Sequence, residues 1–172
     1  QTENQFSKAI GNVATITYAA ARGKYIALCE GDDYWTDPQK LQKQVDTLEA
    51  NPDCSFCFTN VLKLVQKTNQ LLPVSIPNII NGRITLKSYI ERGGYIPTLT
   101  VMFKISCLPA QLPDFFMTAI KQDWLTFLIL LKKGDGIYLD EISGVYRYHE
   151  KSLLMNTKEV ALWRNIIYLV EN

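Results

Sequence analysis

Hydrophobic residues recur along this chain in two alternating patterns. Short apolar runs of strand length are separated by segments whose apolar residues return every three or four positions, the spacing of an amphipathic helix. The expected strands cover residues 24–29, 55–65, 98–104, 136–140 and 142–148. The expected helices cover residues 7–22, 38–50, 85–92, 123–133 and 159–170. Helices that alternate with strands in this way predict an α/β domain.

Local signals place several element boundaries. Gly23 is expected to end the first helix, and Asp37-Pro38 to begin the second as N-cap and first helical residue. Thr85 is the expected cap of the third helix, and residues 69–82 are expected to be irregular or a hairpin. The spacing of the second helix predicts one buried face made of Leu41, Val45 and Leu48.

Three acidic residues follow the apolar run at residues 24–29. Glu30, Asp32 and Asp33 would lie at the carboxyl end of a buried strand, where open α/β sheets bind ligands. Clustered carboxylates repel one another and resist desolvation, so a bound cation is the simplest compensation. Oxygen ligands favour Mg²⁺ or Mn²⁺ over zinc. The alternative is a solvated acidic turn before a helix.

The surrounding sequence gives these acids a context. Residues 21–38 read Ala-Arg-Gly-Lys-Tyr-Ile-Ala-Leu-Cys-Glu-Gly-Asp-Asp-Tyr-Trp-Thr-Asp-Pro. The segment closely resembles the centre of family 2 glycosyltransferases, and the resemblance extends over roughly residues 1 to 152. It implies that Glu30-Gly31-Asp32 matches the family's metal-binding Asp-x-Asp motif, with Asp32 as the main ligand of Mn²⁺ or Mg²⁺. Glu30 stands where the family usually has the first Asp of that motif.

The resemblance also implies a fold and a domain boundary. The expected architecture is a single-domain, A-type (Rossmann-like) α/β sandwich with a mixed central sheet whose first strands are missing. Residues 1–172 would then form a partial catalytic domain. They would hold the metal and acceptor half of the site and lack the nucleotide-binding amino-terminal part.

Residues near the carboxyl end supply the catalytic candidates. The resemblance implies that Asp123, at the start of a helix, is the base that deprotonates the acceptor, although Gln122 stands where a first acid is usual. A helix-capping Asp is the alternative reading. The resemblance further implies that His149 and Ser152 approach the metal or diphosphate, and that Arg147 pairs with phosphate. Arg147 binding a structural carboxylate is the alternative.

Substrate contacts are expected around the acidic loop. Asp33 would orient the metal or bind donor hydroxyls, unless it is a turn carboxylate. Tyr34 and Trp35 would form an aromatic platform for a sugar, although core packing of Trp35 is an equal alternative. Thr98 and Thr100, on one face of their expected strand, match the segment that lines the acceptor side in similar enzymes.

The implied function is an inverting glycosyltransferase that moves a sugar from a nucleotide-sugar, most simply a UDP-sugar, to a saccharide or lipid-linked acceptor hydroxyl. Bacterial polysaccharide biosynthesis is the family's commonest setting. Two alternatives remain open. One is a non-catalytic saccharide-binding or scaffolding domain that keeps the fold, and the other is a different metal-dependent enzyme such as a nucleotidyltransferase.

Composition narrows the partners. The net charge is +1 and there is no basic run, which argues against nucleic acid. No stretch reaches the roughly 20 apolar residues of a transmembrane helix. The four cysteines lack zinc-ligand spacing and read as buried thiols, which is consistent with a reducing cytosol. We therefore expect a cytoplasmic protein, with a peripheral position at the inner face of a membrane left open. The oligomeric state is not determined.

Overall fold

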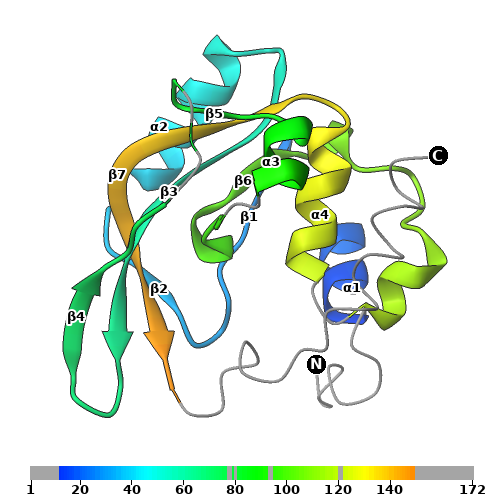
Figure 1. The fold of residues 1–172 in the computed structure, drawn as a ribbon. Helices are drawn as coiled ribbons and strands as arrows, with labels where there is room; N and C mark the ends of the chain where they lie inside the picture. Colours follow the sequence, from blue (N-terminus) through cyan, green and yellow to red (C-terminus); the bar gives the residue numbers. More distant parts are fainter. Residues whose placement is uncertain (1–11, 77–78, 80, 93–94, 120–121, 150–172) are drawn as a thin grey trace.

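The protein has a mixed α/β fold built on one curled sheet (Figure 1). The computed structural model describes residues 12–76, 79, 81–92, 95–119 and 122–149. Within these residues the strands follow the order β1-β6-β3-β7-β2, while β4 pairs with β3 and β5 with β7. Only β3 and β7 are parallel, and every other pair is antiparallel. The predicted α/β class and mixed central sheet are confirmed.

Seven strands make up the described sheet. They are β1 (Tyr25–Ala27), β2 (Tyr34–Trp35), β3 (Cys54–Val65), β4 (Gln70–Pro73), β5 (Arg83–Ile84), β6 (Met102–Lys104) and β7 (Asp135–Tyr148). The segment at 69–82 contains the predicted hairpin, because β4 folds back on β3. The two strands expected at 136–148 are a single strand. Its register shifts where Thr59 pairs with Leu139 and the next residue of β3 pairs with Ile142, so Asp140 and Glu141 form a bulge.

Four α-helices and three short 3₁₀ turns complete the described fold. They are α1 (Asn12–Ala20), α2 (Lys40–Ala50), η1 (Thr98–Thr100), α3 (Leu86–Arg92), η2 (Ile105–Cys107), η3 (Asp114–Thr118) and α4 (Gln122–Leu131). The first four predicted helices are therefore confirmed within the described residues. The fifth, at 159–170, lies outside them. Thr85 caps α3 as predicted, because its Oγ1 accepts from Ser88 N at 3.1 Å.

The alternation of side chains along β3 sorts the core into two layers. Phe56 and Phe58 face α1, α3 and α4, and the rings of Phe56 and Phe127 stack with centroids 6.0 Å apart. Cys57 points to the opposite face, where it packs with Leu48 of α2. Successive residues of a strand face opposite sides, so one strand serves both layers. Helices therefore cover both faces of the sheet.

The buried face of α2 differs from the predicted one. Leu48 is buried, but Leu41 is 43% exposed, and Lys40 and Gln44 take the inner positions. The helix also begins at Lys40 rather than at Pro38, and Asp37 instead accepts a hydrogen bond from Gln39 N at 2.8 Å. Apolar spacing was misleading here because polar side chains of α2 bind groups of the sheet below it.

The segment expected as a strand at 98–104 is also different. Residues 98–100 form η1, in which Thr100 N donates to Pro97 O at 2.9 Å and Val101 N to Thr98 O at 3.0 Å. The strand begins only at Met102. Thr98 and Thr100 therefore do not share a strand face. The buried-thiol prediction fails for Cys29, which is exposed, and holds for Cys54 and Cys57.

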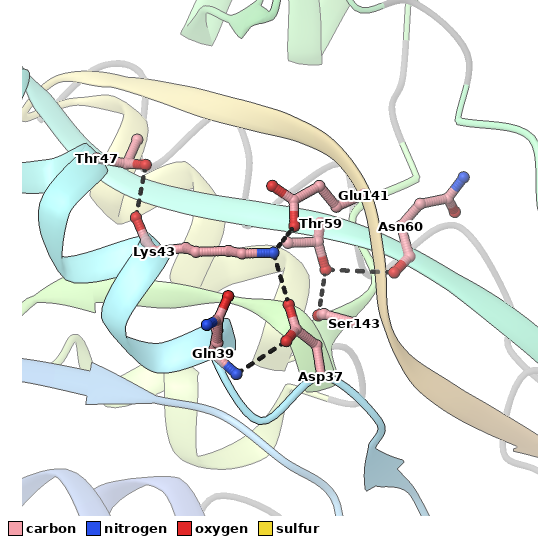
Figure 2. A network of polar contacts seen from close by, with 8 residues as sticks. All are labelled: Asp37, Gln39, Lys43, Thr47, Thr59, Asn60, Glu141 and Ser143. Carbon is pink, nitrogen blue, oxygen red and sulfur yellow. Dashed lines mark hydrogen bonds and ion pairs between the residues drawn. The ribbon is translucent and has the colours of Figure 1, made fainter.

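A polar network fastens the start of α2 to the β7 bulge (Figure 2). Lys43 Nζ lies 3.0 Å from Asp37 Oδ2 and 2.5 Å from Glu141 Oε2. Beside this pair the hydroxyls of Thr59 and Ser143 share a buried hydrogen bond of 2.5 Å. The bulge thus turns Glu141 toward α2, and the segment that follows β2 is held against the sheet.

Candidate functional site

The acidic loop, residues 30–33, joins two separate parts of the sheet. Before it, β1 pairs with β6, and Leu28 N extends that edge by donating to Val101 O at 2.9 Å. After it, β2 pairs with β7, with Tyr34 opposite Val145. The loop therefore crosses from the β6 side of the sheet to the carboxyl end of β7. This crossing brings the acids next to residues more than a hundred positions later in the chain.

Two contacts join the acidic loop to the end of β7. His149 Nε2 lies 3.2 Å from Asp32 Oδ2. Arg147 N donates to Asp33 Oδ1 at 2.8 Å. The structure thus brings together four of the residues that the sequence selected. Asp32 remains exposed, whereas Asp33 is half-buried and serves partly to hold the strand end.

Asp123 lies in the first turn of α4 and is exposed. Thr98 Oγ1 donates to Asp123 Oδ2 at 3.4 Å, a long contact that links η1 to α4. The neighbouring Gln122 does not face the site in the same way, because its Nε2 donates to Phe116 O at 2.9 Å. The pair at this position is therefore Gln122 and Asp123, and Asp123 supplies its one carboxylate, which reaches solvent.

The charge of Asp123 acts on Glu30 of the acidic loop. Glu30 reaches solvent, yet the protein around it and the charges of Asp33, Asp123 and Asp32 raise its pKa to about 7. Burial also raises the pKa of Asp33, although the hydrogen bond from Arg147 N opposes the shift. Four carboxylates therefore share one region of the surface. Like charges at this density favour proton uptake or a bound cation.

The acidic region offers some donor atoms that suit a divalent cation, but not a complete set of ligands among the described residues. Among the described residues no three His, Cys, Asp or Glu side chains form a group that encloses a metal. Asp32 and His149 nevertheless present one carboxylate oxygen and one imidazole nitrogen at 3.2 Å from each other. These donor types suit Mn²⁺, and the remaining positions would belong to ligand oxygens and water.

Two predicted substrate contacts lie inside the protein. Thr100 is fully buried, and its hydroxyl lies 2.9 Å from both Thr59 O and Pro97 O, the two acceptors open to its single proton. Trp35 is half-buried, and its Nε1 donates to Leu99 O at 2.6 Å while Lys40 Nζ lies 4.3 Å from its ring centroid. Both side chains support the scaffold, so neither is kept as a substrate contact. Tyr34 remains 44% exposed beside the loop.

The charges of these carboxylates act on two tyrosines, Tyr18 and Tyr95, that the sequence analysis did not select. Burial raises the pKa of Tyr95 to about 12, and Tyr146, Asp33, Glu30 and Asp123 act in the same direction. Burial also raises the pKa of Tyr18 of α1, the hydrogen bond with Thr126 opposes that shift, and Asp123 and Glu30 add to it. Nothing in the local pattern marks these residues, since tyrosines near an apolar run read as ordinary core. Ser152, the remaining predicted site residue, lies outside the described residues.

Comparisons with known proteins do not assign a family. No protein-family model matches the chain. The chain is 34% identical over 134 residues to uncharacterized proteins of Mycobacterium bovis and of two strains of Mycobacterium tuberculosis. The match covers 76% of this chain and 36% of each relative, so the chain spans about a third of the length of these relatives. Separately, no helix within the described residues has the length and apolarity to cross a bilayer.

Proposed function

We propose that this chain is the metal and acceptor half of an inverting glycosyltransferase with the A-type nucleotide-sugar fold. The observation that carries the proposal is the meeting of Asp32 with His149, 3.2 Å apart, in a region that Glu30, Asp33 and Asp123 also share. A carboxylate and an imidazole from distant segments meet beside further acids that reach solvent. This arrangement suits binding of a metal-diphosphate next to a carboxylate base.

The proposed reaction is a single displacement at the anomeric carbon of the donor sugar. The acceptor hydroxyl oxygen forms the new bond to that carbon, and the bond to the diphosphate oxygen breaks with its electron pair. The hydroxyl proton passes to the Asp123 carboxylate, which is exposed and contacts Thr98 Oγ1 at 3.4 Å. Asp123 lies in the first turn of α4, so its carboxylate is placed at the helix end that faces the acceptor in this proposal.

The metal would be held by Asp32 and His149 together with donor oxygens. When bound, Mn²⁺ or Mg²⁺ supplies positive charge that stabilises the leaving diphosphate. Asp33 holds the end of β7 through Arg147 N at 2.8 Å and so keeps His149 near the loop. Tyr34, 44% exposed, offers a ring face to a sugar. Donor and acceptor are proposed by class alone, as a nucleotide-sugar and a saccharide or lipid-linked hydroxyl.

Calorimetric titration of UDP into the intact protein, with and without Mn²⁺, tests this proposal. We expect binding only when Mn²⁺ is present, and loss of that binding in Asp32→Ala. Asp46→Ala is the matched control, because Asp46 is an exposed aspartate of α2 whose side chain binds Gln42. UDP binding whose affinity is the same without Mn²⁺ and in Asp32→Ala would contradict the proposed metal site.

Transfer activity separates an enzyme from a binding domain that keeps the fold. A panel of nucleotide-sugars is incubated with the intact protein and Mn²⁺, and release of UDP or another nucleoside diphosphate is measured. Release that depends on both Asp32 and Asp123 supports the transferase. Metal-dependent binding without any release in the presence of saccharide acceptors would instead identify a non-catalytic saccharide- or nucleotide-binding domain.

A further inference from the structure

Lys40 is a lysine inside the protein. It is the first residue of α2, its side chain is 1% exposed, and it lies under the segment that follows the acidic loop. Lysine is almost never fully buried unless its ammonium is paired. Here Nζ donates to Gln44 Oε1 at 2.7 Å and sits 4.3 Å from the centre of the Trp35 ring. The charge is therefore held by an amide and an aromatic face rather than by a carboxylate.

Both partners of Lys40 bind the same short segment. Trp35 Nε1 donates to Leu99 O at 2.6 Å, and Gln44 Nε2 donates to Thr100 O at 2.7 Å. These two carbonyls are consecutive and belong to η1. The ammonium thus fixes two side chains, and each of them holds one carbonyl of η1.

The packing around η1 leaves little room for it to move. A Cβ at Gly144 of β7 would lie 2.5 Å from Leu99 Cδ1 and 3.1 Å from Tyr34 O, so β7 runs close to both η1 and β2 at this point. Thr98, at the other end of η1, donates to Asp123 Oδ2 at 3.4 Å. A continuous set of contacts therefore runs from Lys40 through Trp35 and Gln44 to η1, and from η1 to Asp123.

We propose that Lys40 is a positioning residue that sets η1, and through Thr98 the carboxylate of Asp123, at a fixed place relative to the acidic loop. Trp35 is three residues after Asp32, so the Lys40 ammonium contacts the segment that directly follows the acidic loop. Through Gln44 and η1 it is also linked to Thr98, which binds Asp123. This inference rests on the proposed function for its catalytic consequence. Its structural content, the coupling of Lys40 to Thr98, stands independently of any activity.

The electrical surroundings of Lys40 agree with a fixed position. Burial lowers its pKa to about 8, while Cys57 of β3, Cys29 before the loop and Asp37 before α2 oppose that shift. The lysine is therefore charged at neutral pH, and it keeps its hydrogen bond to Gln44. A displaced Lys40 would lose its contacts with Gln44 and with the Trp35 ring together.

Methyl NMR of the intact protein labelled on threonine methyl groups tests the coupling. Thr98 and Thr100 lie on η1, and their signals are assigned with Thr98→Val and Thr100→Val. We expect Lys40→Met to shift both signals, and Gln44→Leu to shift them in the same direction. Lys87→Met is the matched control, because Lys87 is a lysine of α3 with a side chain 79% exposed.

The outcome that overturns the proposal is a Thr98 signal that stays in place in Lys40→Met while signals on α2 itself move. The double variant Lys40→Met/Gln44→Leu tests separately whether the two residues act through one network. Residues that act through one network are non-additive, so its shifts should equal those of the larger single variant. Fully additive shifts would also reject the shared network.

Kinetics then separate this proposal from the proposed function. If the wild type transfers sugar, Lys40→Met should lower kcat by about tenfold or more and leave the donor KM within about twofold, because a small misplacement of the base costs rate more than binding. An unchanged kcat with a changed KM would contradict the positioning role. A wild type without Mn²⁺-dependent binding or turnover would refute the proposed function, while the Thr98 shifts would still decide the role of Lys40.

Discussion

Two charged regions lie on either side of the short strand β2, and they are built on opposite principles. The carboxylates of Glu30, Asp32, Asp33 and Asp123 share one region that solvent reaches, and burial together with the charges of the other three raises the pKa of Glu30 to about 7. Lys40 is 1% exposed and is held by Gln44 and the Trp35 ring. The first region holds several negative charges close together. The second holds one positive charge that contacts an amide and an aromatic ring.

This difference separates a site from its scaffold. A buried ion that contacts an amide and an aromatic ring of the same chain is part of the fold, because the chain itself supplies its partners. Crowded carboxylates at the surface are not balanced in this way, and a cation or protons would complete them. Four experiments test the contrast, beginning with the largest expected effect.

Removal of the Asp123 carboxylate should have the largest consequence. Asp123→Asn keeps the size of the side chain and its place near Thr98 but removes the base. We expect transfer to slow by about a thousandfold, within the usual range for a general base. Asp46→Asn, on the opposite layer of the molecule, should leave the rate unchanged. A rate in Asp123→Asn equal to that of the wild type would remove Asp123 from the proposed chemistry.

Titration of Lys40 should change stability at alkaline pH. Its folded pKa of about 8 is below the ordinary value of 10.5, so between these values the unfolded chain binds the extra proton. The free energy of unfolding should therefore rise as pH increases from 8 to 10.5, by about 3 kcal/mol in total. Urea denaturation at several pH values measures this. Lys40→Met should lack the rise, and an equal rise in the variant would show that other groups cause it.

Glu30 should show the opposite dependence at lower pH. Its folded pKa of about 7 is above the ordinary 4.5, so the folded state holds the extra proton between these values. The stabilisation is present below pH 4.5 and is lost as pH rises through 7. Because Glu30 reaches solvent, the total is on the order of 1 kcal/mol. Denaturation of Glu30→Gln should show a flatter profile, and added Mn²⁺ should flatten that of the wild type.

The ion pairs of Lys43 should contribute least. Lys43 joins Asp37 to Glu141, but its side chain is 39% exposed, so solvent screens both pairs. Lys43→Met should lower the free energy of unfolding only slightly, because exposed ion pairs contribute little to stability. The loss should shrink in high salt, where Lys40→Met should be little affected. A large loss that does not depend on salt would contradict this, and would show that the ion pairs of Lys43 stabilise the fold as buried contacts do.

Much of the fold and part of the site were predictable because their signals are local. Strand-length apolar runs gave β1 and β3, Thr85 capped α3, and the acids after residue 29 marked the loop. Lys40 and Tyr95 were not predictable in the same way. A lysine shortly after Asp-Pro is expected at the surface from any local pattern. Its burial depends on Trp35 and Gln44, which are held by carbonyls of η1 far away in sequence.

The sequence by itself determined most of the alternation of helices and strands, the Thr85 cap of α3 and the acidic composition of the loop. These properties follow from side-chain periodicity and turn chemistry within a few residues. Only the tertiary structure decided that Asp32 meets His149, that Trp35 turns inward, and that Lys40 and Gln44 replace Leu41 on the buried face of α2. Those choices depend on the register of β7 with its bulge at Asp140 and Glu141 and on the path of η1. Both are set by contacts between segments distant in the chain, which no local pattern contains.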